Sequence, residues 1–110
     1  RQAGVRLAEA EALLTLAGAC AGEERFEEAL AGAERALALF GELGRRGRQA
    51  EVAGLVSALL VRLESPERAL SSSEGALALA REAGSASDRV VAALMLAGAH
   101  LQRGEAEGAL

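Results

Sequence analysis

The chain has 110 residues, of which 51% are hydrophobic and 2% aromatic, and its formal net charge is −4. This length suits one compact domain or a slice of a longer array, and the acidic balance argues against a nucleic-acid partner, which normally requires a basic face. The single cysteine, Cys20, excludes an internal disulfide framework and fits a reducing, cytoplasmic compartment, and the longest uncharged stretch, residues 90–102, is too short to span a membrane.

Ala, Leu, Glu and Arg dominate the composition, and all four are good helix formers. β-Branched residues are few, with some Val, one Thr and no Ile. We therefore expect an all-α protein without any strand. Because an Ala side chain buries little area, the core of such a protein has to rely on close approach of helix backbones.

The first two predicted helices each carry an apolar stripe. In the first helix, which ends at Gly22, the stripe is formed by Leu7, Ala10, Leu14 and Ala17. The second helix covers residues 25–43, and its stripe is formed by Phe26, Leu30, Ala33, Leu37 and Phe40. Gly44 follows at the usual position of a helix stop. We interpret the basic cluster after it as a solvated interhelical loop rather than a phosphate site; its members are Arg45, Arg46 and Arg48.

The third predicted helix covers residues 48–63, and Ser65 and Pro66 then suit the N-cap and the first position of a fourth. The fourth helix runs to residue 83, where Gly84 again suits a stop. A fifth begins at residues 87–88 and ends near Gly104. Residues 105–110 begin a sixth helix that the chain does not finish.

The sequence repeats itself with a period of 40 residues. ALAGAERALALFGELG (29–44) aligns with ALSSSEGALALAREAG (69–84), and LAGACAGEERFEEAL (16–30) aligns with LAGAHLQRGEAEGAL (96–110) at twice that distance. A fixed period of this size predicts a repeat array in which each unit buries its apolar face on its neighbour. We expect one domain over residues 1–110, with two-helix units at about 5–44, 45–84 and an incomplete 85–110. Ala29 and Ala69 should lie where the two helices of a unit cross.

The unit resembles a tetratricopeptide repeat. In that family helix A carries a Leu-Gly or Leu-Ala pair, helix B begins near an aromatic residue, and Ala and Ala-Leu follow at fixed distances. The first unit matches with Leu16-Ala17, Phe26, Ala29 and Ala36-Leu37. The second matches with Val56-Ser57, Ala69 and Ala76-Leu77, but has Pro66 instead of the aromatic residue; the third has Leu96-Ala97, Ala106 and Ala109. The resemblance implies a right-handed α-α superhelix of five helices and the start of a sixth, similar to arrays in large bacterial signal-transduction ATPases and transcriptional regulators.

The resemblance also implies a partner-binding surface, because helix A of each unit lines the concave groove in this family. By that register the groove positions are Leu14, Gly18, Ala21 and Gly22, then Gly54, Ala58, Val61 and Arg62, and then Leu94, Gly98, Leu101 and Gln102. These residues are mainly apolar and small, with Arg62 as the main charge. They favour an apolar helix or peptide, or the array's own continuation, over the carboxylate that basic grooves of the family hold. The alternative is that GC-rich codons supplied the Ala and Gly residues.

Cys20 and His100 occupy the same repeat position, which in the family holds an aromatic residue packed between helices. One Cys and one His two repeats apart are too few for a metal site, and no nucleophile is placed beside His100 by the sequence. We expect Cys20 to be a buried thiol.

We therefore expect a scaffold for protein binding that is not an enzyme and needs no cofactor. The alternative is a ligand-sensing region of a bacterial transcriptional regulator. The open side of the fifth helix, where Val90, Ala93, Leu94, Ala97 and Leu101 recur, further predicts self-association as a two-fold homodimer, through this side or through the apolar groove.

Overall fold

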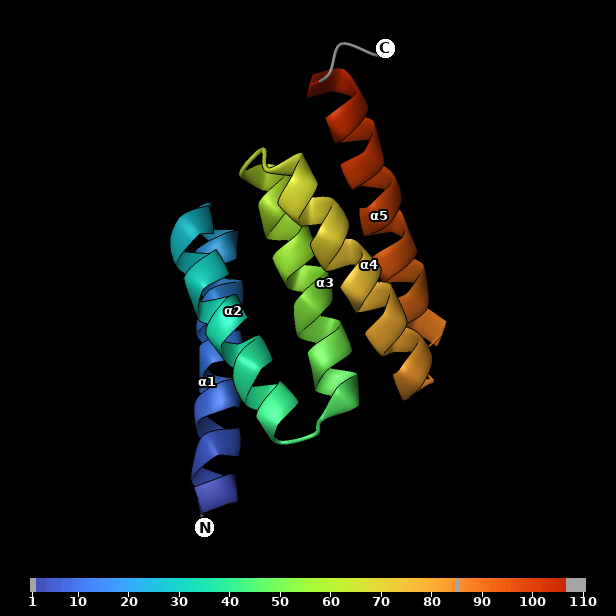
Figure 1. The fold of residues 1–110 in the computed structure, drawn as a ribbon. Coiled ribbons are helices and arrows are strands. Elements are labelled where there is room, and N and C mark those ends of the chain that lie inside the picture. Colours follow the sequence, from blue (N-terminus) through green and yellow to red (C-terminus); the bar gives the residue numbers. More distant parts are fainter. Residues whose placement is uncertain (1, 85, 107–110) are drawn as a thin grey trace.

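The computed structural model describes residues 2–84 and 86–106, and within these residues it contains five α-helices and no strand (Figure 1). The helices are α1 (Gln2–Gly22), α2 (Phe26–Glu42), α3 (Arg46–Arg62), α4 (Pro66–Ala83) and α5 (Ala86–Ala106). The all-α prediction is confirmed, and the first four helices begin and end within a few residues of their predicted bounds.

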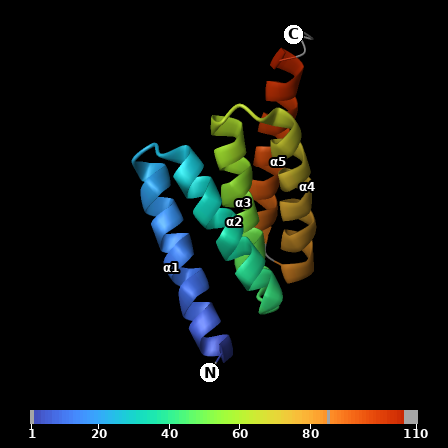
Figure 2. The same cartoon turned by 60° about the vertical axis from the view of Figure 1, so that its left-hand side comes forward.

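Successive helices run antiparallel, so that α1, α3 and α5 point one way while α2 and α4 point the other (Figures 1 and 2). Each helix packs on the next in the chain, and α3 also packs on α5. There is no comparably extensive contact between α1 and α3. The carboxyl ends of α1, α3 and α5 therefore share one end of the molecule, and that end holds the candidate site described below.

The turns between helices recur with the 40-residue period of the sequence. Glu24 and Glu64 have positive φ of 63° and 56°, and Gly44 and Gly84 have 68° and 72°. After α1 the amide of Arg25 donates to the carbonyl of Cys20 at 2.9 Å, and after α3 the amide of Ser65 donates in the same way to Leu60 at 2.9 Å. This is the pattern of a helix closed by a left-handed residue. The first and third turns use a glutamate where the second and fourth use a glycine.

Ser65 stands at the N-cap of α4 and Pro66 at its first position, as predicted. The Ser65 side chain, however, makes no capping hydrogen bond. Its ψ of 73° nearly equals the ψ of 72° at Arg25, the residue before α2. The backbone at both positions is set by the closure of the preceding helix, and this conformation differs from the extended one in which a serine caps.

Two boundary predictions are wrong. The fifth helix does not end near Gly104, because α5 continues through Gly104 to Ala106. Glycine ends a helix when it adopts positive φ, and among the described glycines only Gly44 and Gly84 do so. The remainder of the predicted sixth helix, residues 107–110, lies outside the described residues. The expected loop at the arginine cluster is also wrong, since Arg46 and Arg48 form the first turn of α3.

These arginines are held by ion pairs. Arg48 pairs with Glu51 of its own helix at 2.9 Å and with Glu11 of α1 at 3.1 Å, and Arg46 pairs with Glu82 of α4 at 3.7 Å. The hydrogen bond that Arg48 donates to Glu51 and the charge of Glu11 raise the pKa of Arg48 above its ordinary value. The cluster thus ties the start of α3 to its neighbours.

The core is built mainly from small residues at helix crossings. Ala29 and Ala69 are both completely buried, as predicted for the crossing of the two helices of a unit. Phe40 is the largest fully buried side chain of the described residues, and it lies in the main cluster with Ala17, Cys20 and residues of α3. A smaller cluster joins α3, α4 and α5 through Ala53, Ala76 and Ala92.

The second helix pair, α3 and α4, has two fully buried serines. The Ser57 hydroxyl donates to the carbonyl of Ala53 at 3.0 Å and forms a hydrogen bond with the hydroxyl of Ser72 across the helix crossing at 3.1 Å. The buried hydroxyl of Ser73 has no hydrogen-bond partner within the part of the chain that is described. Because buried hydroxyls are normally paired, Ser73 is a local source of instability.

Candidate partner-binding site

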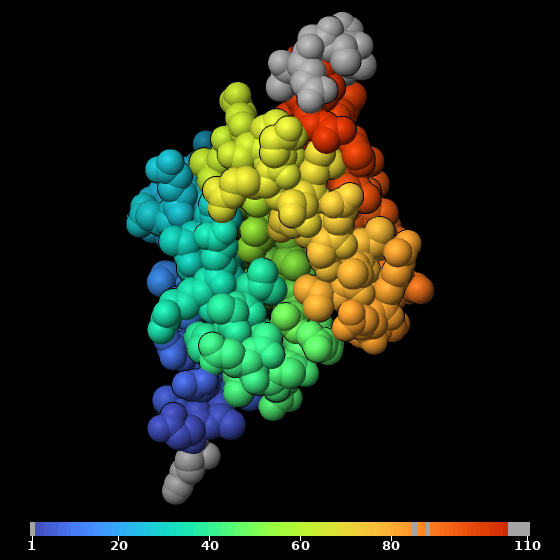
Figure 3. Space-filling model, in the orientation of Figure 1, coloured from blue at the N-terminus to red at the C-terminus, as the bar shows by residue number. Residues whose placement is uncertain are grey.

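Several hollows open on the described surface, and one of them lies between α2 and α4. Figure 3 shows it between α2 and α4, with α3 at its floor. Its volume is about 290 Å³, and its lining includes Val56 and Leu60 of α3. An ion pair between Glu34 of α2 and Arg68 of α4, 3.0 Å long, crosses from one wall to the other. This pair ties the two walls together, so the hollow is a poor entrance for a partner.

Two further hollows lie at the carboxyl ends of α1, α3 and α5. The first hollow, between α1 and α3, has a volume of about 290 Å³ and is lined by Ala21, Gly22, Glu24, Phe26, Leu55, Ala58, Leu59 and Arg62. The second hollow, between α3 and α5, has about 540 Å³ and is lined by Val61, Arg62, Glu64, Pro66, Gln102 and Glu105. Arg62 belongs to both, so the two hollows adjoin at its side chain.

Residue size explains why the first hollow stays open. A β-carbon placed on Gly54 of α3 would lie only 3.7 Å from the Val91 side chain of α5, so these two helices approach closely. The residues 40 positions earlier are Leu14 on α1 and Glu51 on α3. A leucine and an ion-paired glutamate cannot give the same close approach, and α1 stays apart from α3. The small residues Ala21 and Ala58 then leave the space between the helices unfilled.

Arg62 places a positive charge against an aromatic ring. Its guanidinium lies 5.7 Å from the centre of the Phe26 ring, the usual distance of a cation–π contact. Within the described chain no carboxylate lies within 4.0 Å of it. Its charge is therefore available to an incoming carbonyl or carboxylate oxygen.

Gln102 occupies in α5 the repeat position that Arg62 occupies in α3. Its side-chain Nε2 donates to the backbone carbonyl of Val61 at 2.8 Å, which ties α5 to the end of α3. The Oε1 atom of the same amide is buried and has no partner among the described residues. An unpaired buried acceptor is costly, so this atom would gain from an N–H donor brought by a partner.

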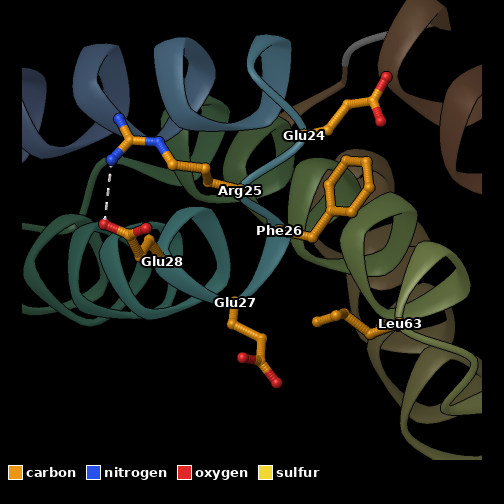
Figure 4. A pocket seen from close by; sticks show the side chains of 6 residues that line it. All are labelled: Glu24, Arg25, Phe26, Glu27, Glu28 and Leu63. Atoms are coloured by element: carbon orange, nitrogen blue, oxygen red, sulfur yellow. Dashed lines mark hydrogen bonds and ion pairs between the residues drawn. The ribbon is translucent and has the colours of Figure 1, made fainter.

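The rim of this end is acidic. A shallow pocket of about 290 Å³ beside the first hollow is lined by Glu24, Arg25, Phe26, Glu27, Glu28 and Leu63, and Figure 4 shows the Phe26 ring between Glu24 and Leu63. Arg25 pairs with Glu23 at 2.7 Å and Glu28 at 3.3 Å; Glu28, Cys20 and Glu23 raise the pKa of its guanidinium above the ordinary value. Glu24, Glu27 and Glu64 form no ion pair with a described residue. The rim thus favours a basic partner.

The structure gathers about half of the predicted groove residues at this site. Those that line the two hollows are Ala21, Gly22, Ala58, Val61, Arg62 and Gln102. The others lie elsewhere: Leu14 packs against the core, Gly54 is buried against α5, and Gly18 is exposed on α1 away from the hollows. Leu94, Gly98 and Leu101 lie on the exposed side of α5. Phe26, Leu55 and Glu64 line the hollows without having been predicted there.

Cys20 and His100 differ in their surroundings despite their common repeat position. Cys20 is buried and carries a free thiol, as predicted. His100, which the repeat position predicts to be a packed or partly exposed structural residue, has an exposed side chain. Cys20 is covered by α2, and the described chain contains no helix in the corresponding place beside α5. No group of three or more His, Cys, Asp or Glu residues within the described ranges is arranged to hold a metal ion.

In comparisons with known proteins, no protein-family model and no curated protein sequence matches this chain. None of the helices in the described segments combines the length and apolarity needed to cross a bilayer.

Proposed function

We propose that this chain is a non-enzymatic, tetratricopeptide-like module that binds a protein partner through the first and second hollows. The partner is a peptide or helix with an apolar side chain at its centre and basic residues beside it. The recurrence of the left-handed turns every 40 residues supports the repeat assignment, because such a repeat of geometry accompanies the repeat of sequence.

One arrangement carries the proposal: two adjoining hollows share Arg62, which forms no ion pair with a described residue, and the second holds the buried Oε1 of Gln102, which has no partner among the described residues. A peptide backbone offers a hydrogen-bonding partner to each of these side chains: a carbonyl oxygen for Arg62 and an N–H for Gln102. Apolar side chains of the partner would occupy the space beside Ala58 and Phe26. The acidic rim would attract basic flanks and speed their encounter with the site.

Selection from a displayed random-peptide library on the immobilised chain tests this function. We expect enriched peptides with an apolar centre and Lys or Arg flanks, whose synthetic forms bind in a fluorescence polarisation assay. Ala58→Met would fill the first hollow and weaken binding by about tenfold, which corresponds to about 1.4 kcal/mol. Arg62→Gln would also weaken binding, and added salt would weaken it further because the rim charges are exposed.

Ala78→Met is the matched control, because Ala78 is exposed on α4 away from both hollows and the substitution is the same. It should leave binding unchanged. Peptides that bind Ala58→Met and the parent chain equally would show that the hollows are not the site. Failure to enrich any peptide, together with specific binding of a small molecule that Ala58→Met abolishes, would favour the ligand-sensing alternative.

A further inference from the structure

The side of α5 that points away from α4 is an exposed apolar surface. We call it the α5 face and define it by Val90, Ala93, Leu94, Ala97 and Leu101. Its three large residues are 57–62% exposed. Residues 90–102 include no Asp, Glu, Lys or Arg, so the face carries no formal charge along three turns of helix. An apolar patch of this extent commonly marks an interface.

The repeat shows that this fold normally covers such a face with a helix. The residues 40 positions earlier lie on α3 and are Ala50, Ala53, Gly54, Ser57 and Val61, of which the first four are buried. On α3 this side is covered by α4, which packs against it, and α2 packs against α1 in the same way. No described helix occupies the equivalent place beside α5. The α5 face is thus a surface built for a helix partner.

The two covering helices share one feature on the side that they bury. Their fully buried positions are separated by four, three and four residues: Ala29, Ala33, Ala36 and Phe40 in α2, and Ala69, Ser73, Ala76 and Ala80 in α4. All except Phe40 are small. The approach is correspondingly close, since a β-carbon on Gly32 of α2 would lie 3.6 Å from the β-carbon of Ala17 of α1. A helix that covers the α5 face therefore needs a stripe of small residues.

The outer side of α1 has such a stripe, and it is exposed. Ala8, Ala12, Thr15 and Ala19 follow the same spacing of four, three and four residues. We call this the α1 face. Leu16 beside it is 59% exposed, whereas Val56, the residue 40 positions later, is 4% exposed because α2 packs on that side of α3. Residues 12–22 contain no charged side chain, so charge repulsion does not oppose its burial.

We propose that the α1 face of a second copy covers the α5 face, so that copies of this chain associate head to tail. Large residues on one face, Leu94 and Leu101, would then meet small residues on the other, and within one molecule leucines of α1 likewise pack against the main cluster that holds the buried alanines of α2. Two α5 faces would instead place large residues against large ones. Because α1 and α5 form opposite edges of the molecule (Figure 1), each added copy leaves one α1 face and one α5 face free, and the assembly grows with concentration.

Two charge substitutions test the pairing by complementation. Leu94→Glu places a charge on the α5 face, and Leu16→Glu places one beside the α1 face, so that neither altered face can be buried in a contact. Both positions are exposed, so circular dichroism should show that the fold persists. In sedimentation velocity at tens to hundreds of micromolar, the parent mean mass should rise to about twofold or more above the monomer mass. Each variant alone should be a monomer. Their mixture should form a one-to-one dimer that grows no further, because each retains the face that the other lacks.

Ala78→Glu on the exposed side of α4 is the matched control and should associate like the parent. A parent chain that stays monomeric would overturn the proposal, and so would a mixture of the two variants that stays monomeric. Dimers formed by Leu16→Glu alone would show a two-fold contact between α5 faces instead. Ala58→Met should associate normally, which separates this proposal from peptide binding in the hollows.

Discussion

The first helix pair, α1 and α2, and the second pair, α3 and α4, have the same turns but different cores. Glu24 and Glu64 close the first helix of each pair in the same left-handed conformation. The buried residues of the second helix differ, however: Phe40 in the first pair corresponds to Ala80 in the second. Turn geometry and the spacing of small residues therefore define this unit, while side-chain volume varies between units.

The largest expected effect tests where the core volume is concentrated. Phe40 is completely buried in the main cluster, so Phe40→Ala leaves a cavity and should cost about 3–5 kcal/mol in the free energy of unfolding, measured with urea. Leu16→Ala is the control, because Leu16 is mostly exposed and its truncation should change stability by about 0.5 kcal/mol or less. A loss below about 1 kcal/mol for Phe40→Ala would mean that the first pair repacks like the second, which already has Ala there.

Much of the fold could be predicted because its signals are local. Helix-forming composition, the apolar stripes and the glycines at 44 and 84 act within one or two turns of chain, and the structure agrees with them. Glu24 and Glu64 could not be identified as left-handed residues, since glutamate has no preference for positive φ. Nor could the continuation of α5 through Gly104, because a glycine permits a stop without enforcing one.

The candidate site was only partly predictable for a different reason. The repeat register predicts Ala21, Ala58 and Arg62 on one concave surface, and these three residues line the first hollow. Gly54 is instead buried by Val91, a contact that depends on the distance between two helices. That distance is set by pairs of side chains far apart in the sequence. The exposure of His100 likewise depends on whether a distant segment packs over it. A single sequence indicates on which face of a helix a residue lies more readily than it indicates which neighbouring residue covers that face.

A smaller effect concerns the polar groups that distinguish the second pair from the first. Ser73 corresponds to the buried Ala33, and its hydroxyl has no partner within the described chain. Ser73→Ala should therefore stabilise the protein by about 1 kcal/mol, visible as a higher urea midpoint at unchanged slope. Ser57→Ala is the matched comparison and should destabilise by about 1 kcal/mol, because the Ser57 hydroxyl forms a hydrogen bond with Ser72 across the helix crossing. Equal effects of the two substitutions would contradict the difference in hydrogen bonding.

The smallest effect concerns the turns that the two pairs share. A left-handed conformation costs a residue other than glycine about 1–2 kcal/mol, and Glu64 adopts it without an ion pair to any described residue. Glycine removes that cost but loses about 0.5–1 kcal/mol to the greater freedom of the unfolded chain. Glu64→Gly should thus raise stability by a few tenths to about 1 kcal/mol in urea unfolding.

Gly84→Ala, the reverse exchange at the next left-handed turn, should lower stability by about 1 kcal/mol. If both substitutions lowered stability, the Glu64 side chain would have a stabilising role at the second hollow that outweighs its backbone strain.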